Sequence, residues 1–192
     1  MSITAKDVNE LRKKTGAGMM DCKKALTESN GNMEDAIDFL RKKGQKIAAK
    51  RGDRDAKEGL VIAKSNNNIG YLICLNCETD FVAKNDDFSK LANYFIELAL
   101  DSNSDSLEDF LKLKYQDSEL TISEKITEQS GVIGEKIEIS YFDKILSEKV
   151  VAYNHPGNQI ASLVGLTISS SSNLESGSII NLPFLSGSFF NL

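Results

Sequence analysis

The sequence predicts an α+β protein, with a small helical domain at the N-terminus and a core built on a mostly antiparallel sheet. Three observations predict this fold class. Apolar residues recur at helical spacing over residues 1–44, later segments alternate as strands around short polar turns, and helices and strands are mixed without a clean βαβ repeat. The chain has 192 residues and is 41% hydrophobic, which is enough for one or two small domains with their own cores.

The first helix is predicted by its start signals. Thr4 can act as the N-cap, Asp7 stands at the third helical position, and Ile3 can pack on Val8 as a hydrophobic staple. The glycines within residues 16–18 interrupt the apolar stripe, so we expect this helix to end there.

Two more helices complete the N-terminal domain. We expect the second over residues 19–29, with one face formed by Met19, Cys22 and Leu26. Asn32 should cap the third helix, and Gly44 should end it. Residues 46–58 are charged and poor in large apolar side chains, which predicts a short helix followed by a linker.

Residues 60–100 predict a β-hairpin followed by a helix. Strands over 60–64 and 70–77 flank an Asn-rich turn at 66–68. The helix over 85–100 should turn an apolar face to the core. That face is formed by Phe88, Leu91, Ala92, Phe95 and Ala99.

The rest of the core mixes both kinds of element. Helices are expected over 107–113 and 122–129, followed by a strand over 136–142. One face of that strand should be formed by Ile137, Ile139 and Tyr141. A second hairpin is expected over 150–153 and 159–168, across a His-Pro-Gly-Asn turn. This order favours helices packed on one face of the sheet.

The charge and the cysteine content limit the function classes. The net charge is −5 with a pI of about 5.0, which does not favour wholesale nucleic-acid binding. The charge is uneven, because residues 1–58 carry an excess of Lys and Arg and the remainder an excess of Asp and Glu. We expect no secretory signal, no membrane span and no disulfide framework from three cysteines, and therefore a cytoplasmic protein.

The Cys74-x-x-Cys77 spacing is that of redox and metal sites, but its context differs. Redox pairs place this spacing at a helix N-terminus, whereas here it falls in a predicted strand. Residues three apart on a strand point to opposite faces, so the two sulfurs should diverge. We expect buried cysteines, neither bridged nor sharing a metal ion.

Other candidate catalytic patterns are incomplete. The segment 131–136 has two residues between its glycines and Ile137 after its Lys, so it does not match a phosphate-binding loop. His155 has no nucleophile motif beside it and is expected in a turn. Glu78 and Asp80 would share a strand face if the strand extended that far. We predict no enzyme active site, no cofactor and no metal site.

The segment Thr79-Asp80-Phe81-Val82 is an unusual corner, because an aromatic residue follows an acid between a strand and a helix. Phe81 can be a core residue. If strand alternation holds, Cys77 and Phe81 face one way and Glu78 and Asp80 the other, and Phe81 is then a wedge-type contact for a partner.

Three stretches together resemble the translation elongation factor Ts family: residues 11–26, residues 76–83, and the strand region from Lys136 that follows Ile133-Gly134-Glu135. The likeness runs from residue 2 to about residue 168. It implies a guanine nucleotide exchange factor for elongation factor Tu, with no catalytic site of its own.

The resemblance also implies site residues. The three-helix head is similar to a ubiquitin-associated-like (UBA-like) domain that docks on the partner's GTPase domain through Arg12, Met19 and Met20. Thr79–Val82 matches the exchange motif, in which Asp80 and Phe81 intrude beside the partner's Mg²⁺ and nucleotide. His155 is similar to a family turn residue and is a possible secondary contact.

The chain departs from the family after about residue 168, as if truncated or divergent. We expect the domains 1–45 (three helices, UBA-like), 46–58 (charged helix and linker), 59–142 (first core subdomain), 143–168 (start of a second) and 169–192 (a Ser-rich, apolar tail). The strand over 159–168 would then expose an edge. Two alternatives stay open: an adaptor that binds elongation factor Tu without exchange activity, and a thiol oxidoreductase that uses Cys74 and Cys77.

Overall fold

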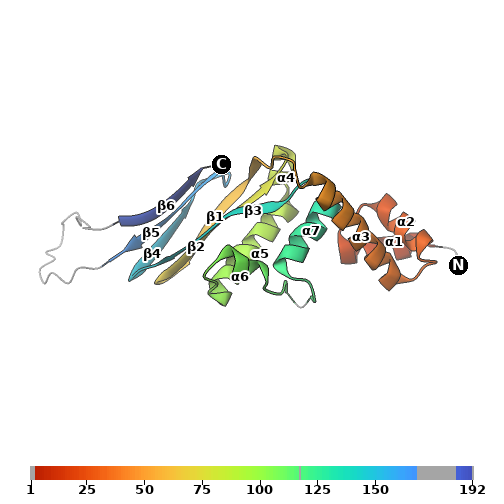
Figure 1. Cartoon of the computed structure of the whole chain (residues 1–192), viewed down its shortest axis with the longest axis horizontal. Helices are drawn as coiled ribbons and strands as arrows, with labels where there is room; N and C mark the ends of the chain where they lie inside the picture. Colours follow the sequence, from red (N-terminus) through yellow and green to blue (C-terminus); the bar gives the residue numbers. More distant parts are fainter. Residues whose placement is uncertain (1–2, 117, 168–184, 192) are drawn as a thin grey trace, which may run out of the picture. The chain divides into compact units, whose positions relative to one another are not determined.

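A computed structural model describes residues 3–116, 118–167 and 185–191, the last of these as backbone only. Its contacts divide the chain into two compact units, one of Met1–Asp55 with Lys114–Ile137 and the other of Ala56–Leu113 with Glu138–Leu192. Helices and antiparallel sheets are combined, which confirms the α+β class (Figure 1). No helix in the described part is both long enough and apolar enough to cross a lipid bilayer.

The N-terminal unit is helical. It contains α1 (Ala5–Thr15), α2 (Met19–Glu28), α3 (Met33–Arg51) and α7 (Ile122–Ile133). Thr4 and Asp7 form the predicted capping box, and Ile3 packs against the core that contains Val8. The buried members of this core are Val8, Leu11, Ala17, Cys22, Ala25, Leu26 and Ala36.

The prediction that the third helix ends at Gly44 is wrong. α3 continues to Arg51, so the short helix expected at the start of residues 46–58 is the end of α3 itself. The reason is tertiary. Gly44 is buried where α3 crosses α7, and a Cβ built on Gly44 would lie 3.4 Å from the Cα of Gly131. This glycine therefore permits a close helix–helix approach instead of a left-handed cap.

The second unit begins with a three-stranded sheet in the order β1-β2-β3. These strands are β1 (Glu58–Asn66), β2 (Ile69–Cys77) and β3 (Glu138–Leu146), all antiparallel. The first hairpin is as predicted, and Asn67 takes a left-handed φ of 51° in its turn, which Asn tolerates. Tyr71, Ile73 and Leu75 alternate along β2 with Leu72 and Cys74, and all five are buried because both faces of the sheet are covered.

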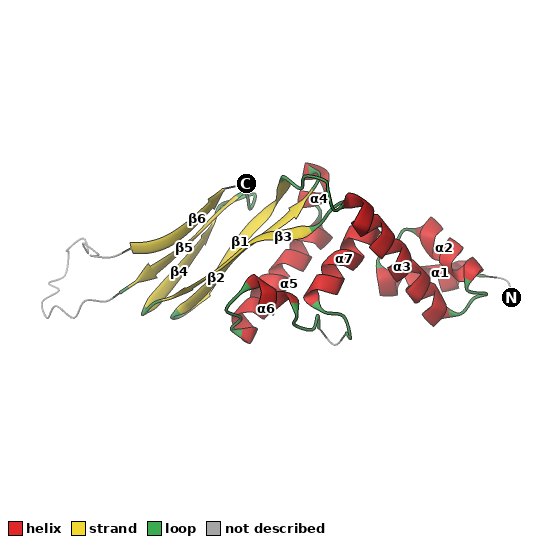
Figure 2. Cartoon of the chain, in the orientation of Figure 1, coloured by secondary structure: helices red, strands yellow, loops and turns green. Residues whose placement is uncertain are grey.

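Helices cover one face of this sheet (Figure 2). They are α4 (Asp80–Ala83), α5 (Asp86–Ser102) and α6 (Leu107–Leu111). The predicted inward face of α5 is confirmed, with its five expected side chains all buried. Phe95, Phe110, Phe142 and Tyr71 form a chain of ring contacts between the helices and the sheet.

A second sheet covers the other face of the first. It is formed by β4 (Lys149–Asn154), β5 (Ile160–Leu166) and β6 (Leu185–Asn191) in that order. The shared core contains Val61, Ala63, Leu72, Cys74, Val150, Ala161 and Leu163. β5 pairs with β4 and β6, so the expectation of an exposed edge at 159–168 is wrong. The expected tail at 169–192 otherwise lies largely outside the described residues.

A β-bulge in β3 overturns one predicted face. The register shifts so that Ile139 lies opposite Leu75, whereas Tyr141 lies opposite Cys74. Leu75 and Cys74 are neighbours on β2 and point to opposite faces, so Ile139 and Tyr141 do too. Tyr141 packs on the core between the two sheets, while Ile139 faces the helices.

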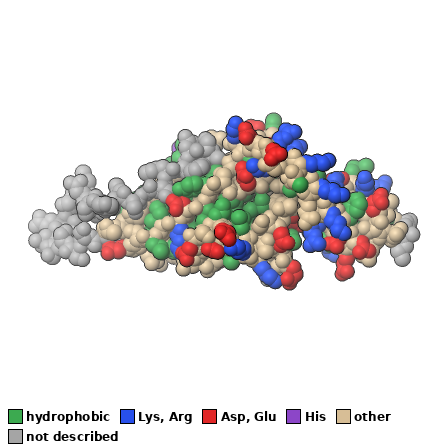
Figure 3. Space-filling view, in the orientation of Figure 1, with side chains coloured by type: hydrophobic (Ala, Val, Ile, Leu, Met, Phe, Trp, Pro, Cys, Tyr) green, Lys and Arg blue, Asp and Glu red, His purple; other side chains and the backbone are tan. Residues whose placement is uncertain are grey.

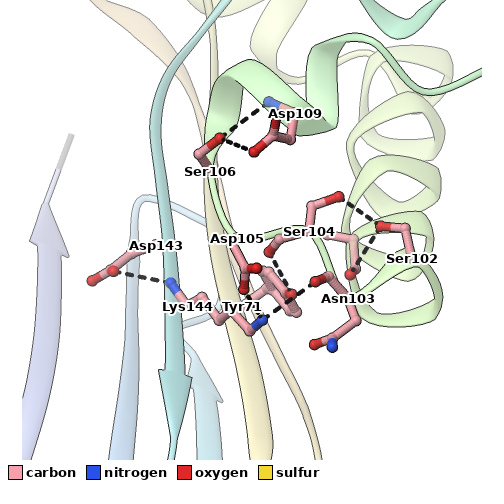
Figure 4. Close-up of polar contacts among 10 residues, drawn as sticks. Tyr71, Ser102, Asn103, Ser104, Asp105, Ser106, Asp109, Asp143 and Lys144 are labelled. Carbon is pink, nitrogen blue, oxygen red and sulfur yellow. Dashed lines mark hydrogen bonds and ion pairs between the residues drawn. The ribbon is translucent and has the colours of Figure 1, made fainter.

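A polar network ties β3 to the loop after α5 (Figure 4). The Lys144 ammonium donates to the carboxylate of Asp105 at 2.5 Å and to the carbonyl oxygen of Asn103 at 3.3 Å. The Tyr71 hydroxyl donates to the carbonyl oxygen of Ser104 at 2.7 Å. These hydrogen bonds hold the loop that starts at Asn103, whose φ is left-handed. They also provide hydrogen-bond donors for the carbonyl oxygens of Asn103 and Ser104.

Candidate functional site

The segment Thr79–Val82 forms a single helical turn. β2 ends at Cys77, Thr79 is the N-cap of α4, and Asn85 then caps α5. The strand therefore does not extend to Glu78 and Asp80, and the condition under which those carboxylates would share a strand face is not met. Backbone hydrogen bonds close the turn, from Ala83 N–H to Thr79 O at 3.2 Å and from Lys84 N–H to Asp80 O at 3.0 Å.

Phe81 projects from this turn into solvent. Its side chain is 83% exposed, the largest exposed fraction among the exposed large hydrophobic residues of the described chain. Val82 and Asp80 on the same turn are partly buried. The core interpretation of Phe81 is therefore excluded. The ring is exposed, as the wedge interpretation expected, although a helical turn and not a strand end presents it.

Asp80 is held by a cation of its own turn. Lys84 donates to the Asp80 carboxylate at 2.7 Å, at the i,i+4 spacing of a helix. This hydrogen bond lowers the pKa of Asp80 below its ordinary value, so the carboxylate is ionised at neutral pH. The sequence analysis did not single out Lys84, although the spacing from Asp80 to Lys84 was a usable signal.

The three expected docking residues lie in the other unit. Arg12 is exposed on α1, while Met19 and Met20 open α2 and are 53% and 77% exposed. Met19 shares the helical spacing of Cys22 and Leu26, as predicted, but unlike them it is exposed. Met19 is in the first turn after Gly18, ahead of the buried residues of α2. Both methionines are thus available as flexible apolar contacts.

His155 lies in the turn between β4 and β5, as predicted. It is exposed, and its Nδ1 lies 2.8 Å from the hydroxyl oxygen of Tyr153. The structure thus brings together Thr79–Val82 on one turn. It places His155 on a different loop of the same unit.

The patterns rejected on sequence are inert in the structure. Cys74 and Cys77 are buried thiols that form no disulfide, and they donate to Asn76 Oδ1 and to Thr79 O, respectively. Burial raises the pKa of the Cys74 thiol, which disfavours the reactive thiolate. Gly131 lies inside α7 and Gly134 is its left-handed C-cap, so 131–136 is no phosphate loop.

A small cavity in the N-terminal unit offers no substrate site. It lies among α2, α3 and α7, with a volume of about 30 Å³, and Asp21, Lys43 and Gly131 are among its lining residues. A space of that size holds about one water molecule.

Comparisons with known proteins agree on one family. The family model described as "Elongation factor TS" matches residues 78–179, about half of the chain. The chain is 59% identical to the elongation factor Ts of Christiangramia forsetii over 167 residues, 51% identical to that of Amoebophilus asiaticus over 168, and 48% identical to that of Rhodopirellula baltica over 163. These matches cover 86%, 86% and 85% of this chain, but 60%, 60% and 49% of those proteins. The chain therefore spans about half to three-fifths of the length of the relatives that it matches.

Proposed function

The chain belongs to the elongation factor Ts family, and on this premise we propose that it is a guanine nucleotide exchange factor for elongation factor Tu in protein synthesis. In this role it binds elongation factor Tu·GDP and promotes the release of GDP, and it has no catalytic site of its own. The observation that carries the proposal is the exposure of Phe81 on the α4 turn, because a ring left in water by its own protein is available to a partner.

We assign the exchange step to Thr79–Val82. Mg²⁺ in a GTPase bridges the nucleotide phosphates and protein ligands and neutralises their charge. Insertion of Asp80 and Phe81 beside that ion would displace it and leave the phosphates poorly held. The ion pair of Asp80 with Lys84 supports this assignment, because it holds the carboxylate on the same turn as the ring.

The energy available from Phe81 bounds its effect. Full burial of a Phe side chain is worth about 1.5–3 kcal/mol. Since a tenfold change needs about 1.4 kcal/mol, the ring accounts for roughly a 10- to 150-fold shift in favour of the nucleotide-free partner. Exchange-factor binding and GDP binding weaken each other by the same factor. Larger acceleration requires Mg²⁺ loss and the docking contacts as well.

We assign docking to the helical head. Arg12, Met19 and Met20 would contact the GTPase domain, with the exposed methionines as adaptable apolar contacts. The three-helix head would be a UBA-like domain in this scheme, and His155 a secondary contact. The proposed action on a translation factor places the protein in the cytoplasm and requires neither a membrane nor direct contact with nucleic acid.

The test is the release of fluorescent GDP from elongation factor Tu by the native chain and by Phe81→Ala. We expect the native chain to accelerate release and Phe81→Ala to lose about 10- to 150-fold of that acceleration. Leu146→Ala is the matched control, because Leu146 is a large hydrophobic residue that is 63% exposed but lies on β3. Equal rates for native chain and Phe81→Ala would contradict the assignment.

The same assay addresses the two alternatives. Binding without acceleration by the native chain would support an adaptor. We consider this alternative because the chain matches only 60% of the length of the first relative named above. An activity lost in Cys77→Ser but kept in Phe81→Ala would support the thiol alternative. The burial of both thiols argues against that outcome.

A further inference from the structure

Ion pairs between basic and acidic side chains are distributed unevenly over the described part of the chain. In the second unit and in α7 most lysines pair with carboxylates, as Lys64, Lys84, Lys90, Lys112, Lys125 and Lys144 do, whereas Lys149 has no ion pair with a described residue. On α3, by contrast, Lys42, Lys46 and Lys50 form no ion pair with any described residue. Their neighbours Arg41 and Lys43 are paired with Asp38 and Asp21.

The three unpaired lysines form one stripe, which we call the α3 stripe. They recur at i, i+4 and i+8, so they share a helix face, at intervals of about 6 Å along the axis. All three are exposed, as are Gln45 and Ala49 beside them, whereas Gly44 is buried against α7. Figure 3 shows Lys and Arg side chains gathered over α3.

Helix stability does not explain this stripe. Lys46 has a like charge four residues away on each side, and like charges at that spacing destabilise a helix. Favourable interaction with the helix dipole is confined to the last turn, which contains Lys50 and Arg51 but neither Lys42 nor Lys46. No Asp or Glu lies between Asp38, which pairs with Arg41, and Asp53, so Lys46 has no acidic residue within one turn of α3.

We propose that the α3 stripe is an electrostatic docking surface for a row of carboxylates on the proposed GTPase partner. This inference rests on the proposed function and adds a charged contact to the apolar one at Met19 and Met20. Carboxylates spaced along a helix would match the lysine intervals. The small side chain of Ala49, three residues after Lys46, leaves room for close approach.

An acidic protein surface fits the stripe better than a nucleic acid does. A nucleic acid that extends beyond the basic residues 1–58 would also meet the excess of Asp and Glu in the rest of the chain. A row of a few carboxylates interacts mainly with the nearest lysines, because salt screens the interaction between exposed charges more than about 8–10 Å apart. The six residues from Lys46 to Arg51 also contain no aromatic side chain on which a base could stack.

The experiment is stopped-flow association of the full chain with elongation factor Tu·GDP at several salt concentrations. The variant is Lys42→Glu/Lys46→Glu/Lys50→Glu, and steering predicts at least a tenfold slower association at low salt. The difference should shrink towards 1 M salt, where charges are screened beyond roughly 3 Å. The dissociation rate should change far less than the association rate.

Two further variants keep the result interpretable. Lys64→Glu/Lys112→Glu/Lys149→Glu alters the net charge by the same amount on exposed positions of the second unit, and it should associate at nearly the native rate. The neutral variant Lys42→Gln/Lys46→Gln/Lys50→Gln should also associate more slowly than the native chain, by a smaller factor. It replaces the Glu variant if the reversed charges prevent folding.

The outcomes separate the two proposals. If the native chain does not associate with elongation factor Tu, the proposed function fails and the docking surface fails with it. If the native chain associates and the stripe variants match it at low salt, only the docking surface is overturned. A stripe effect seen on fluorescent poly(U) RNA, but absent with elongation factor Tu, would also overturn it.

Discussion

Gly131→Ala should destabilise the helical unit strongly, whereas Gly44→Ala should not, although the two glycines face each other. A Cβ on Gly131 would lie 2.1 Å from the Cα of Gly44 and 2.9 Å from its carbonyl carbon. Both are backbone atoms, so α3 and α7 would have to move apart. A Cβ on Gly44 would meet the Cα of Gly131 at 3.4 Å, which is close to ordinary van der Waals contact.

The magnitudes follow from two opposing terms. Alanine is favoured over glycine in a helix interior by about 0.5–1 kcal/mol. Overpacking a tight interior costs about 1–3 kcal/mol. For Gly131→Ala the overlap with backbone places the cost at the upper end, so after the helix gain is subtracted the unit should lose about 2–2.5 kcal/mol. For Gly44→Ala the terms nearly cancel or leave a gain of up to about 1 kcal/mol.

Urea unfolding followed by circular dichroism at 222 nm measures both variants. The native chain, Gly44→Ala and Gly131→Ala are compared at equal concentration, and hydrogen exchange on α3 and α7 assigns the change to the helical unit. Equal midpoints for the two variants would refute the reasoning, because it requires that the space around a Cβ differ between Gly131 and Gly44.

Three further outcomes are expected. Met20→Ser should weaken binding to elongation factor Tu about tenfold in calorimetry without shifting the unfolding midpoint, because Met20 is 77% exposed; an unchanged affinity would exclude it from docking. The backbone N–H of Thr4 lowers the pKa of Asp7, so this carboxylate's stabilising contribution is present above its ordinary pKa of 3.8 and is lost as the pH falls through the lowered folded-state value. Acid titration of urea midpoints should therefore show a smaller loss in Asp7→Asn than in the native chain, and equal losses would contradict this assignment. Lys144→Met should speed hydrogen exchange in the loop that contains Asp105 and should lower the free energy of unfolding by up to about 1 kcal/mol. Unaltered exchange would show that the Lys144 contacts do not order this loop.

Features set by short-range chemistry were predictable from the sequence. The capping box of Thr4 and Asp7 depends on residues three apart, and the first hairpin depends on an Asn turn between strands. The inward face of α5 depends on helical spacing alone. The likeness to the elongation factor Ts family likewise came from contiguous motifs, and the comparisons confirm it.

The sequence by itself determined the elements, their caps and the family, because these depend on neighbours in the chain. Only the tertiary structure decided that Gly44 is a helix crossing and not a helix end, since its partner Gly131 is far away in sequence. It also decided that a bulge turns Tyr141 to the second sheet. The exposure of Phe81 belongs to this second group, because burial of a side chain depends on what the rest of the fold packs against it.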